Sequence, residues 1–248
     1  MILFSCFSQI NSSEQAEAIL EKSLTNLGGE KYLQIKTIFS QGNFTIFRDG
    51  TPFLIQTFID IVVLPNKERT DFKSSGEKIV QVNVGNSGWI GDTATQSLRD
   101  QSPEQVKNFI KSIRTSIHNL LSRNWKTEGA KISYIGKREA SVGKRNDVVK
   151  LSYPDGFEVE FEFSSEGLPV KVLYKTKSSE GEEVVEEDRY AQFIEVQGVL
   201  TPFIIDHYKN GIQVSRINFT EVVYNKPVPE QIFQKPKSIK ELKRTPRL

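Results

Sequence analysis

The fold is decided by a stretch in the C-terminal third of the chain, Tyr190-Ala-Gln-Phe-Ile-Glu-Val-Gln-Gly-Val-Leu-Thr-Pro-Phe-Ile-Ile-Asp-His-Tyr-Lys-Asn-Gly-Ile-Gln-Val214, and by its continuation to Phe233. This stretch predicts three consecutive antiparallel strands, which end at Gly198, at Asn210-Gly211 and at Asn225. An Asn-Gly pair between two alternating apolar runs is typical of a tight β-hairpin. The chain is therefore expected to finish in an antiparallel sheet.

The preceding residues predict the rest of this sheet and two amphipathic helices. The first helix runs from Ser13 to Leu27, where apolar residues recur every three or four positions, and Gly28-Gly29 ends it. The second begins at Ser102-Pro103-Glu104, a favourable helix start, and runs to Trp125. Alternating or β-rich runs between turn residues predict strands over 36–47, 53–64, 68–73, 78–84, 89–90, 131–137, 145–153, 157–163, 169–176 and 183–196.

Together these elements predict an α+β fold that is mainly β. About eleven strands with few helices make a strongly twisted sheet that tends to curl. We expect a single strongly curved antiparallel sheet, an open half-barrel, with the amphipathic helices covering its concave face. One domain over 13–234 is expected, preceded by a separate segment over 1–12 and followed by a basic flexible tail over 235–248.

The order of these features is similar to that of a known family. The pattern Y..F..V.G...P..I....NG.....I.F..V..N..V....F, which begins at Tyr190, resembles the closing strands of the LolA/LolB-like lipoprotein carriers. The first helix, its Gly28-Gly29 end and the glycine before Trp89 are also similar to that family. The resemblance covers most of the chain and rests on glycines, prolines and strand order. It implies an open half-barrel that holds acyl chains and performs no chemistry.

The resemblance also implies which residues line the cavity. The lining would consist of Ile55, Ile59, Ile61, Val159, Phe161, Phe163, Val172, Tyr174, Phe203 and Ile205. The lid would consist of Trp89, Phe109, Ile113 and Ile117. Ordinary core packing is the alternative for each of these residues, because composition does not distinguish a filled core from a cavity. In a cavity, an acyl chain would gain roughly 0.8 kcal/mol for each buried methylene.

The sequence contains few candidate catalytic residues. His118 and His207 are its only histidines, and the chain lacks the nucleophile-elbow, phosphate-loop, dinucleotide and metal-ligand spacings. Glu158, Glu160 and Glu162 alternate with apolar residues, which predicts a solvent-facing strand surface, and the acids of 180–188 predict a solvated hairpin tip. We expect no catalytic residue, no metal and no cofactor.

Both ends of the sequence carry features that bear on where in the cell the protein is located. Cys6, preceded by Leu3-Phe4-Ser5, resembles the lipobox of a bacterial lipoprotein whose upstream part is missing, and a frayed terminus with an incidental cysteine is the alternative. The 235–248 segment has six basic residues and one acid, which predicts either a solvated tail or contact with an anionic membrane. The net charge of +2 gives no field that would attract nucleic acid.

The implied function is the binding and carriage of lipid or lipoprotein acyl chains in the bacterial cell envelope, at the periplasmic side. A membrane anchor at Cys6 would suit an acceptor better than a soluble shuttle. Two alternatives stay open. One is an envelope sensor or scaffold of the same fold that recognises lipoproteins or unfolded proteins, and the other is an enzyme with an unrecognised site.

Overall fold

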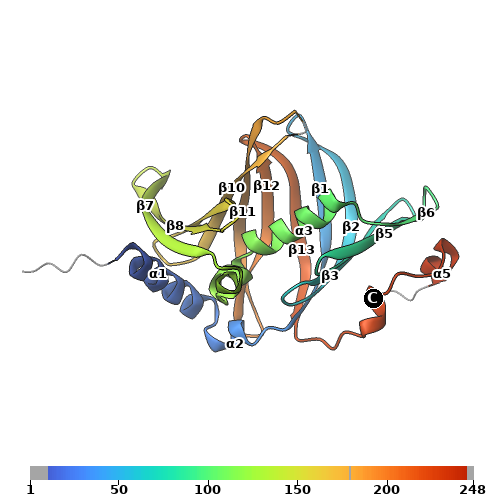
Figure 1. Cartoon of the computed structure of the whole chain (residues 1–248), viewed down its shortest axis with the longest axis horizontal. Coiled ribbons are helices and arrows are strands. Elements are labelled where there is room, and N and C mark those ends of the chain that lie inside the picture. The colour runs from blue at the N-terminus through green and yellow to red at the C-terminus, as the bar shows by residue number, and fades with distance from the viewer. Residues whose placement is uncertain (1–10, 179, 245–248) are drawn as a thin grey trace, which may run out of the picture.

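The computed structural model describes residues 11–178 and 180–244. In this part of the chain, thirteen strands form one antiparallel sheet in the order β6-β5-β4-β3-β2-β1-β13-β12-β11-β10-β9-β8-β7. The sheet curves strongly and is not closed, because β6 and β7 remain at opposite edges (Figure 1). The predicted fold class is confirmed: the protein is mainly β, with one large curved sheet and few helices.

The strands follow the predicted order closely. They are β1 (Thr37–Arg48), β2 (Thr51–Val63), β3 (Lys67–Ser74), β4 (Glu77–Val84), β5 (Ser87–Asp92), β6 (Ser97–Asp100), β7 (Lys131–Ser141), β8 (Lys144–Ser152), β9 (Glu158–Phe163), β10 (Pro169–Lys177), β11 (Glu183–Val196), β12 (Val199–Lys209) and β13 (Ile212–Tyr224). The short edge strand β6 is an addition that the sequence pattern did not indicate. The helices are α1 (Ser12–Leu27), α2 (Glu30–Leu33), α3 (Pro103–Thr115), α4 (Ile117–Leu121) and α5 (Ile239–Arg244), with 3-10 turns η1 (Asn124–Glu128) and η2 (Glu230–Phe233).

Helix α1 begins one residue before the predicted start. Asn11 is the N-cap, and its side chain accepts a hydrogen bond from Ser13 N at 3.2 Å. In turn, the backbone N–H of Asn11 donates a hydrogen bond to the Glu14 carboxylate. These reciprocal bonds form a capping box, which satisfies backbone N–H groups that the helix itself leaves unpaired. Gly28 ends the helix in a conformation with φ of 129°, which a residue with a side chain rarely adopts.

The predicted long helix over 103–125 is wrong in one respect, because it breaks at Ser116. Ser116 has an extended conformation, and its Oγ accepts a hydrogen bond from Asn119 N at 3.1 Å, so it caps the separate helix α4. Serine favours this role because its hydroxyl replaces the missing intrahelical partner. The break allows α3 to cross the middle of the sheet, in front of β13 and β1, while α4 turns towards α1 (Figure 1).

The sheet has an apolar cluster on each face. On the concave side, α1 and α4 pack against β7 to β10. On the convex side, η2 and α5 cover β3 to β5. Strand β2 contributes Ile59 and Ile61 to the convex cluster, while Phe53 and Ile55 near its start are exposed.

The C-terminal segment corrects the predicted domain boundary at 234. Ile239 and Leu242 of α5 are buried on the convex face, and Lys235 Nζ lies 2.8 Å from Asp100 Oδ1. Two further bonds fix the preceding turn: Arg69 donates to the Ile232 carbonyl at 2.7 Å and Trp89 donates to the Phe233 carbonyl at 2.9 Å. Residues 235–244 are thus part of the packed domain, because their apolar side chains cover the outer side of the sheet.

Candidate ligand-binding site

The concave face is divided into a filled half and a hollow half. Over β8 to β10, Phe161 and Phe163 are 0% exposed and contribute to the same cluster as Leu20 of α1 and Leu120 of α4. No space for a ligand remains between these packed side chains. Over β1 to β4 and β11 to β13, three pockets lie on the same face.

The first pocket, here called the lid pocket, lies between α3–α4 and strands β1 to β3. Its volume is about 240 Å³. Phe109 and Ile113 of α3 face Ile38, Val62 and Leu64 of the sheet side across it. The spacing of Phe109 and Ile113, four residues apart, places both on the helix face that meets the sheet.

The second pocket, here called the phenylalanine pocket, lies farther along β1 to β4 and β13. Its volume is about 270 Å³. Its wall is formed by Phe44, Phe58, Phe72, Ile217, Phe219, Asp60, Glu68, Thr70 and Gln81. Phe44 and Phe72 are in tilted contact at 5.6 Å between ring centroids, and Phe58 and Phe219 are in edge contact at 5.8 Å. These aromatic contacts hold the wall in a fixed shape.

The third pocket, here called the tyrosine pocket, lies between α2, the start of α4 and strands β11 to β13. Its volume is about 230 Å³. Its apolar wall includes Ile117, Phe193 and Ile205, and its polar groups are Tyr32, His118, Tyr190, Thr201 and Tyr224.

The three pockets adjoin one another. Glu68 borders both the phenylalanine pocket and the lid pocket, while Ile38, Ser116 and His118 border both the lid pocket and the tyrosine pocket. The three pockets therefore form a row across the concave face, and the lid and tyrosine pockets meet at Ser116, where α3 and α4 separate. We call this row the concave groove.

The structure places the predicted lining residues of β2 on the other face. Ile59 and Ile61 lie in the convex cluster, and Ile55 is 60% exposed near the end of the strand. The residues of β2 that line the pockets are Phe58 and Val62. Because side chains alternate along a strand, only one of these two sets can face the groove. Both sets are apolar, so the alternation in the sequence did not reveal which one it would be.

Trp89 is also on the convex face, in contact with the cluster that contains Phe233, and it is not a lid residue. Val159, Phe161, Phe163, Val172 and Tyr174 do face the concave side, but they belong to its filled half. Phe203 is half-buried beside Phe219, at 6.4 Å between ring centroids. The predicted residues that border the pockets are Phe109, Ile113, Ile117 and Ile205.

Several groove residues were not predicted, and they come from two sources. Tyr32 lies in the short helix α2, where a single aromatic residue gives no periodic signal. Phe44, Phe72 and Phe219 lie on strands whose register brings them to the same face as Phe58. If the strand pairing had been assigned from the hairpins, these phenylalanines could have been predicted, because the register determines which face of the sheet each side chain occupies.

Two acidic side chains, Asp60 and Glu68, lie among the strand residues that line the groove. Asp60 accepts a hydrogen bond from Thr70 Oγ1 at 2.6 Å, and Glu68 accepts one from Asn83 Nδ2 at 3.0 Å. Burial, followed by the negative charge of Glu68, raises the pKa of Asp60 well above its usual value. Burial likewise raises the pKa of Glu68. This end of the groove therefore disfavours negative charge on its own side chains.

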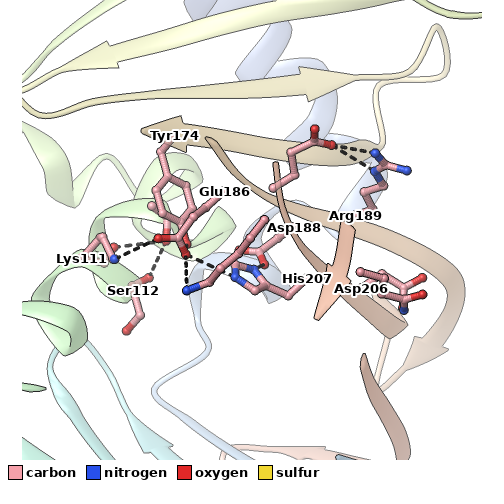
Figure 2. A network of polar contacts seen from close by, with 12 residues as sticks. Lys111, Ser112, Tyr174, Glu186, Asp188, Arg189, Asp206 and His207 are labelled. Atoms are coloured by element: carbon pink, nitrogen blue, oxygen red, sulfur yellow. Dashed lines mark hydrogen bonds and ion pairs between the residues drawn. The ribbon is translucent and has the colours of Figure 1, made fainter. Parts of the chain in front are cut away.

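A polar network lies beneath α3 at the border of the filled half (Figure 2). Nδ1 of His207 is 2.7 Å from Oδ1 of Asp188, and Nε2 of His207 is 3.2 Å from Oε2 of Glu186. Thr176 donates to Glu186 at 2.6 Å, and Lys111 of α3 lies 3.6 Å from the same carboxylate. The network therefore connects β10, β11 and β12 with α3.

The charge states of His207 and Glu186 indicate that this network stabilises the fold. Burial by itself would lower the pKa of His207, but hydrogen bonds to Asp188 and Glu186 outweigh it and raise the pKa to about 9. Burial by itself would raise the pKa of Glu186, but the bonds from His207 and Thr176 lower it to about 2. At neutral pH both groups are charged and paired, so His207 has no free nitrogen with which to accept a proton.

Two predicted solvent surfaces are corrected by these contacts. Glu186 is buried and does not belong to a solvated hairpin tip. Glu162 is 0% exposed and bonds to Arg138 and Asn146 at 2.9 Å each. Glu158 is exposed as predicted, so the correction concerns Glu162, which lies under side chains from β7 and β8.

His118 has a different environment. It stacks on Tyr32 with 5.7 Å between ring centroids, and burial lowers its pKa to about 4, so the imidazole is neutral at physiological pH. Over 11–178 and 180–244, no group of three histidine, cysteine, aspartate or glutamate side chains is placed to hold a metal ion. In the same residues no helix has the length and hydrophobicity needed to cross a membrane. Cys6 lies outside the described residues.

Comparisons with known proteins give the fold. The sequence matches no protein-family model and no curated protein. A solved structure of a DUF1329 family protein from Desulfovibrio piger superposes with a TM-score of 0.61 at 10% identity, over 88% of this chain and 97% of that one. A LolA superfamily protein from Nitrosomonas europaea superposes with a TM-score of 0.58 at 15% identity, over 92% of this chain and 99% of that one.

Both similarities extend over almost the whole sheet and its helices, so they concern the entire domain and not a shared motif. The low identities restrict the conclusion to architecture. The open curved sheet, the crossing helix and these two neighbours together show that this chain has the LolA-like fold.

Proposed function

We propose that this protein binds lipid or lipoprotein acyl chains in the concave groove and carries them without changing them chemically. The observation that carries this proposal is the row of three neighbouring pockets, lid, phenylalanine and tyrosine, that share lining residues on the concave face. A row of apolar pockets of this kind suits a long, thin and flexible ligand. The LolA-like fold supports the same reading by analogy.

The size of the pockets favours an extended ligand. Each has a volume of 230 to 270 Å³, which is below the range of roughly 300–1,000 Å³ for sites that hold compact ligands. A ligand that fills the groove must therefore pass from one pocket to the next. For an acyl chain, each methylene removed from water contributes about 0.8 kcal/mol, so affinity grows with the length that is buried.

A carrier function in the bacterial cell envelope, at the periplasmic side, fits a protein whose binding groove needs no cofactor. Lipidation at Cys6 would hold the groove close to its membrane, and the basic residues near the C-terminus would add attraction to anionic lipids. Non-enzymatic action agrees with the contacts of His207 near the groove, because both of its ring nitrogens are paired with carboxylates.

Ligand binding is tested with the purified full chain. Extraction followed by mass spectrometry should detect a co-purified lipid or lipopeptide, and a pyrene-labelled fatty acid methyl ester should bind to delipidated protein. Ile113→Asp should reduce probe affinity at least tenfold, because it replaces an apolar wall of the lid pocket with a carboxylate, which loses hydration when an apolar ligand lies beside it. Ile113 is only half-buried, so the substitution should leave the fold intact.

The matched control is Ile110→Asp on the same helix. Ile110 borders a different pocket, together with Lys107, Arg114 and Phe157, and it does not border the concave groove. This variant should bind the probe with unchanged affinity. Protein that is free of lipid and fails to bind the probe would refute the proposal, as would equal losses in both variants.

A further inference from the structure

The tyrosine pocket differs from the other two pockets in its polar groups. The rings of Tyr32 and His118 are stacked with 29° between their planes, and Tyr190 and Tyr224 border the same space. Burial raises the pKa of Tyr32 and of Tyr190, with smaller contributions from Tyr224 to the first and from Asp188 and Tyr32 to the second. Three phenols and an imidazole therefore converge in a space of about 230 Å³.

Most of these groups lack a partner within the protein. Tyr224 shares a hydrogen bond of 2.6 Å with Thr201. Among the described residues, none forms a hydrogen bond with the hydroxyl of Tyr32, the hydroxyl of Tyr190 or the ring nitrogens of His118. Tyr32 is only 9% exposed. These groups border the tyrosine pocket, so their hydrogen-bonding capacity is available to a group that enters it.

The pocket is built for an uncharged group. Its lining contains no aspartate, glutamate, lysine or arginine. Burial raises the pKa of Tyr32 and of Tyr190 and lowers the pKa of His118 to about 4, so all three are neutral at physiological pH. An ionised head group placed here would lose its hydration without gaining a counter-charge, which is strongly unfavourable.

We propose that the tyrosine pocket binds the uncharged oxygen-bearing linkage of a lipid, such as a glyceryl ester, through hydrogen bonds from Tyr32, Tyr190 and His118. Phenols and a neutral imidazole each supply one donor, and an ester carbonyl accepts from such donors. The acyl chain then continues through the lid pocket towards the phenylalanine pocket, since Ile38 and Ser116 border both of the first two. This inference rests on the proposed function and adds the chemistry of the ligand and its direction in the groove.

The structure also predicts what the pocket rejects. A site whose buried donors are unpaired discriminates against a ligand that cannot satisfy them, because the donors then remain unpaired in the complex. Dodecyl sulfate carries a permanent charge, and monododecanoyl glycerol carries an ester and two hydroxyls on a chain of the same length. The second should bind at least tenfold more tightly.

The experiment measures binding of these two probes, below their critical micelle concentrations, to the delipidated full chain by calorimetry. Tyr32→Phe and Tyr190→Phe should each weaken monododecanoyl glycerol binding by about 5- to 12-fold, which is the value of one hydrogen bond. They should leave the weak binding of dodecyl sulfate unchanged. Each variant should keep the wild-type Tm without ligand, because neither substitution removes a hydrogen bond within the described part of the protein.

Tyr134→Phe is the matched control, since its hydroxyl donates to Asp147 at 2.9 Å on the outer part of the sheet. It should bind both probes as the wild type does. Wild-type affinity for the glycerol ester in both Tyr32→Phe and Tyr190→Phe would overturn the inference while leaving acyl-chain binding intact. Failure of both probes to bind to the wild-type protein would instead count against the proposed function itself.

Discussion

At the scale of single residues, His207 shows how a buried charge depends on its partners. Its pKa of about 9 lies above the ordinary value of 6.5, because Asp188 and Glu186 bind its charged form. The stabilisation is complete below pH 6.5 and is lost as the pH rises through about 9. The free energy of unfolding should therefore fall by about 1–3 kcal/mol across this window.

Urea unfolding at a series of pH values measures this effect. The substitution His207→Gln should abolish the decline between pH 6.5 and 9, because the remaining network has no group that titrates there. His118→Gln should preserve the decline, since the pKa of His118 is about 4 and its imidazole is already neutral in this window. An unchanged slope in His207→Gln would contradict the assigned charge state.

At the scale of elements, Leu242 packs α5 closely against Gly91 of β5. A Cβ atom at Gly91 of β5 would lie 2.4 Å from Cδ2 of Leu242, which is 1% exposed. Gly91→Ala should therefore cost about 1–3 kcal/mol through overpacking, and Leu242→Ala about 2–4 kcal/mol through loss of burial. Because both act on the same contact, Gly91→Ala should cost much less once Leu242 has been replaced.

A double-mutant cycle measured by urea unfolding tests this prediction, with an expected coupling of about 0.5–3 kcal/mol. Strictly additive costs would mean that α5 does not press on β5. Ile212→Ala is a suitable control, since Ile212 is 60% exposed and should leave stability nearly unchanged.

At the scale of the whole molecule, the two halves of the concave face should respond differently to the same kind of substitution. Phe161→Ala in the filled half should lower the free energy of unfolding by about 3–5 kcal/mol. Phe44→Ala, at the half-buried wall of the phenylalanine pocket, should cost less than about 1.5 kcal/mol. The second variant should instead weaken binding of the acyl probe. Equal stability losses would contradict the division into filled and hollow halves.

The fold was predictable from the sequence because its signals are local. The Asn210-Gly211 turn, the Gly28-Gly29 helix end and the Ser102-Pro103 helix start each act on the residues beside them. Antiparallel neighbours joined by short turns then fix the strand order. The break at Ser116 escaped prediction because the apolar spacing continues across it, and serine at that position is compatible with either conformation.

The site was less predictable because it depends on contacts between residues far apart in the chain. Phe109 and Ile113 could be placed on a groove-facing helix surface from their spacing alone. The orientation of β2, the burial of Glu162 under Arg138 and the convergence of Tyr32 with Tyr190 could not. None of these features has a periodic or short-range signal.

The sequence by itself determined the strands, their hairpin order and the two amphipathic helical regions, since turn chemistry and side-chain alternation act over a few residues. The tertiary structure alone decided which face of β2 became concave, because Ile61 and Val62 are equally apolar and only the positions of α3 and α5 distinguish them. It also decided where the concave face is filled. Side chains are fully buried where α1 and α4 lie on β8 to β10, and pockets remain beneath α3, the start of α4 and α2.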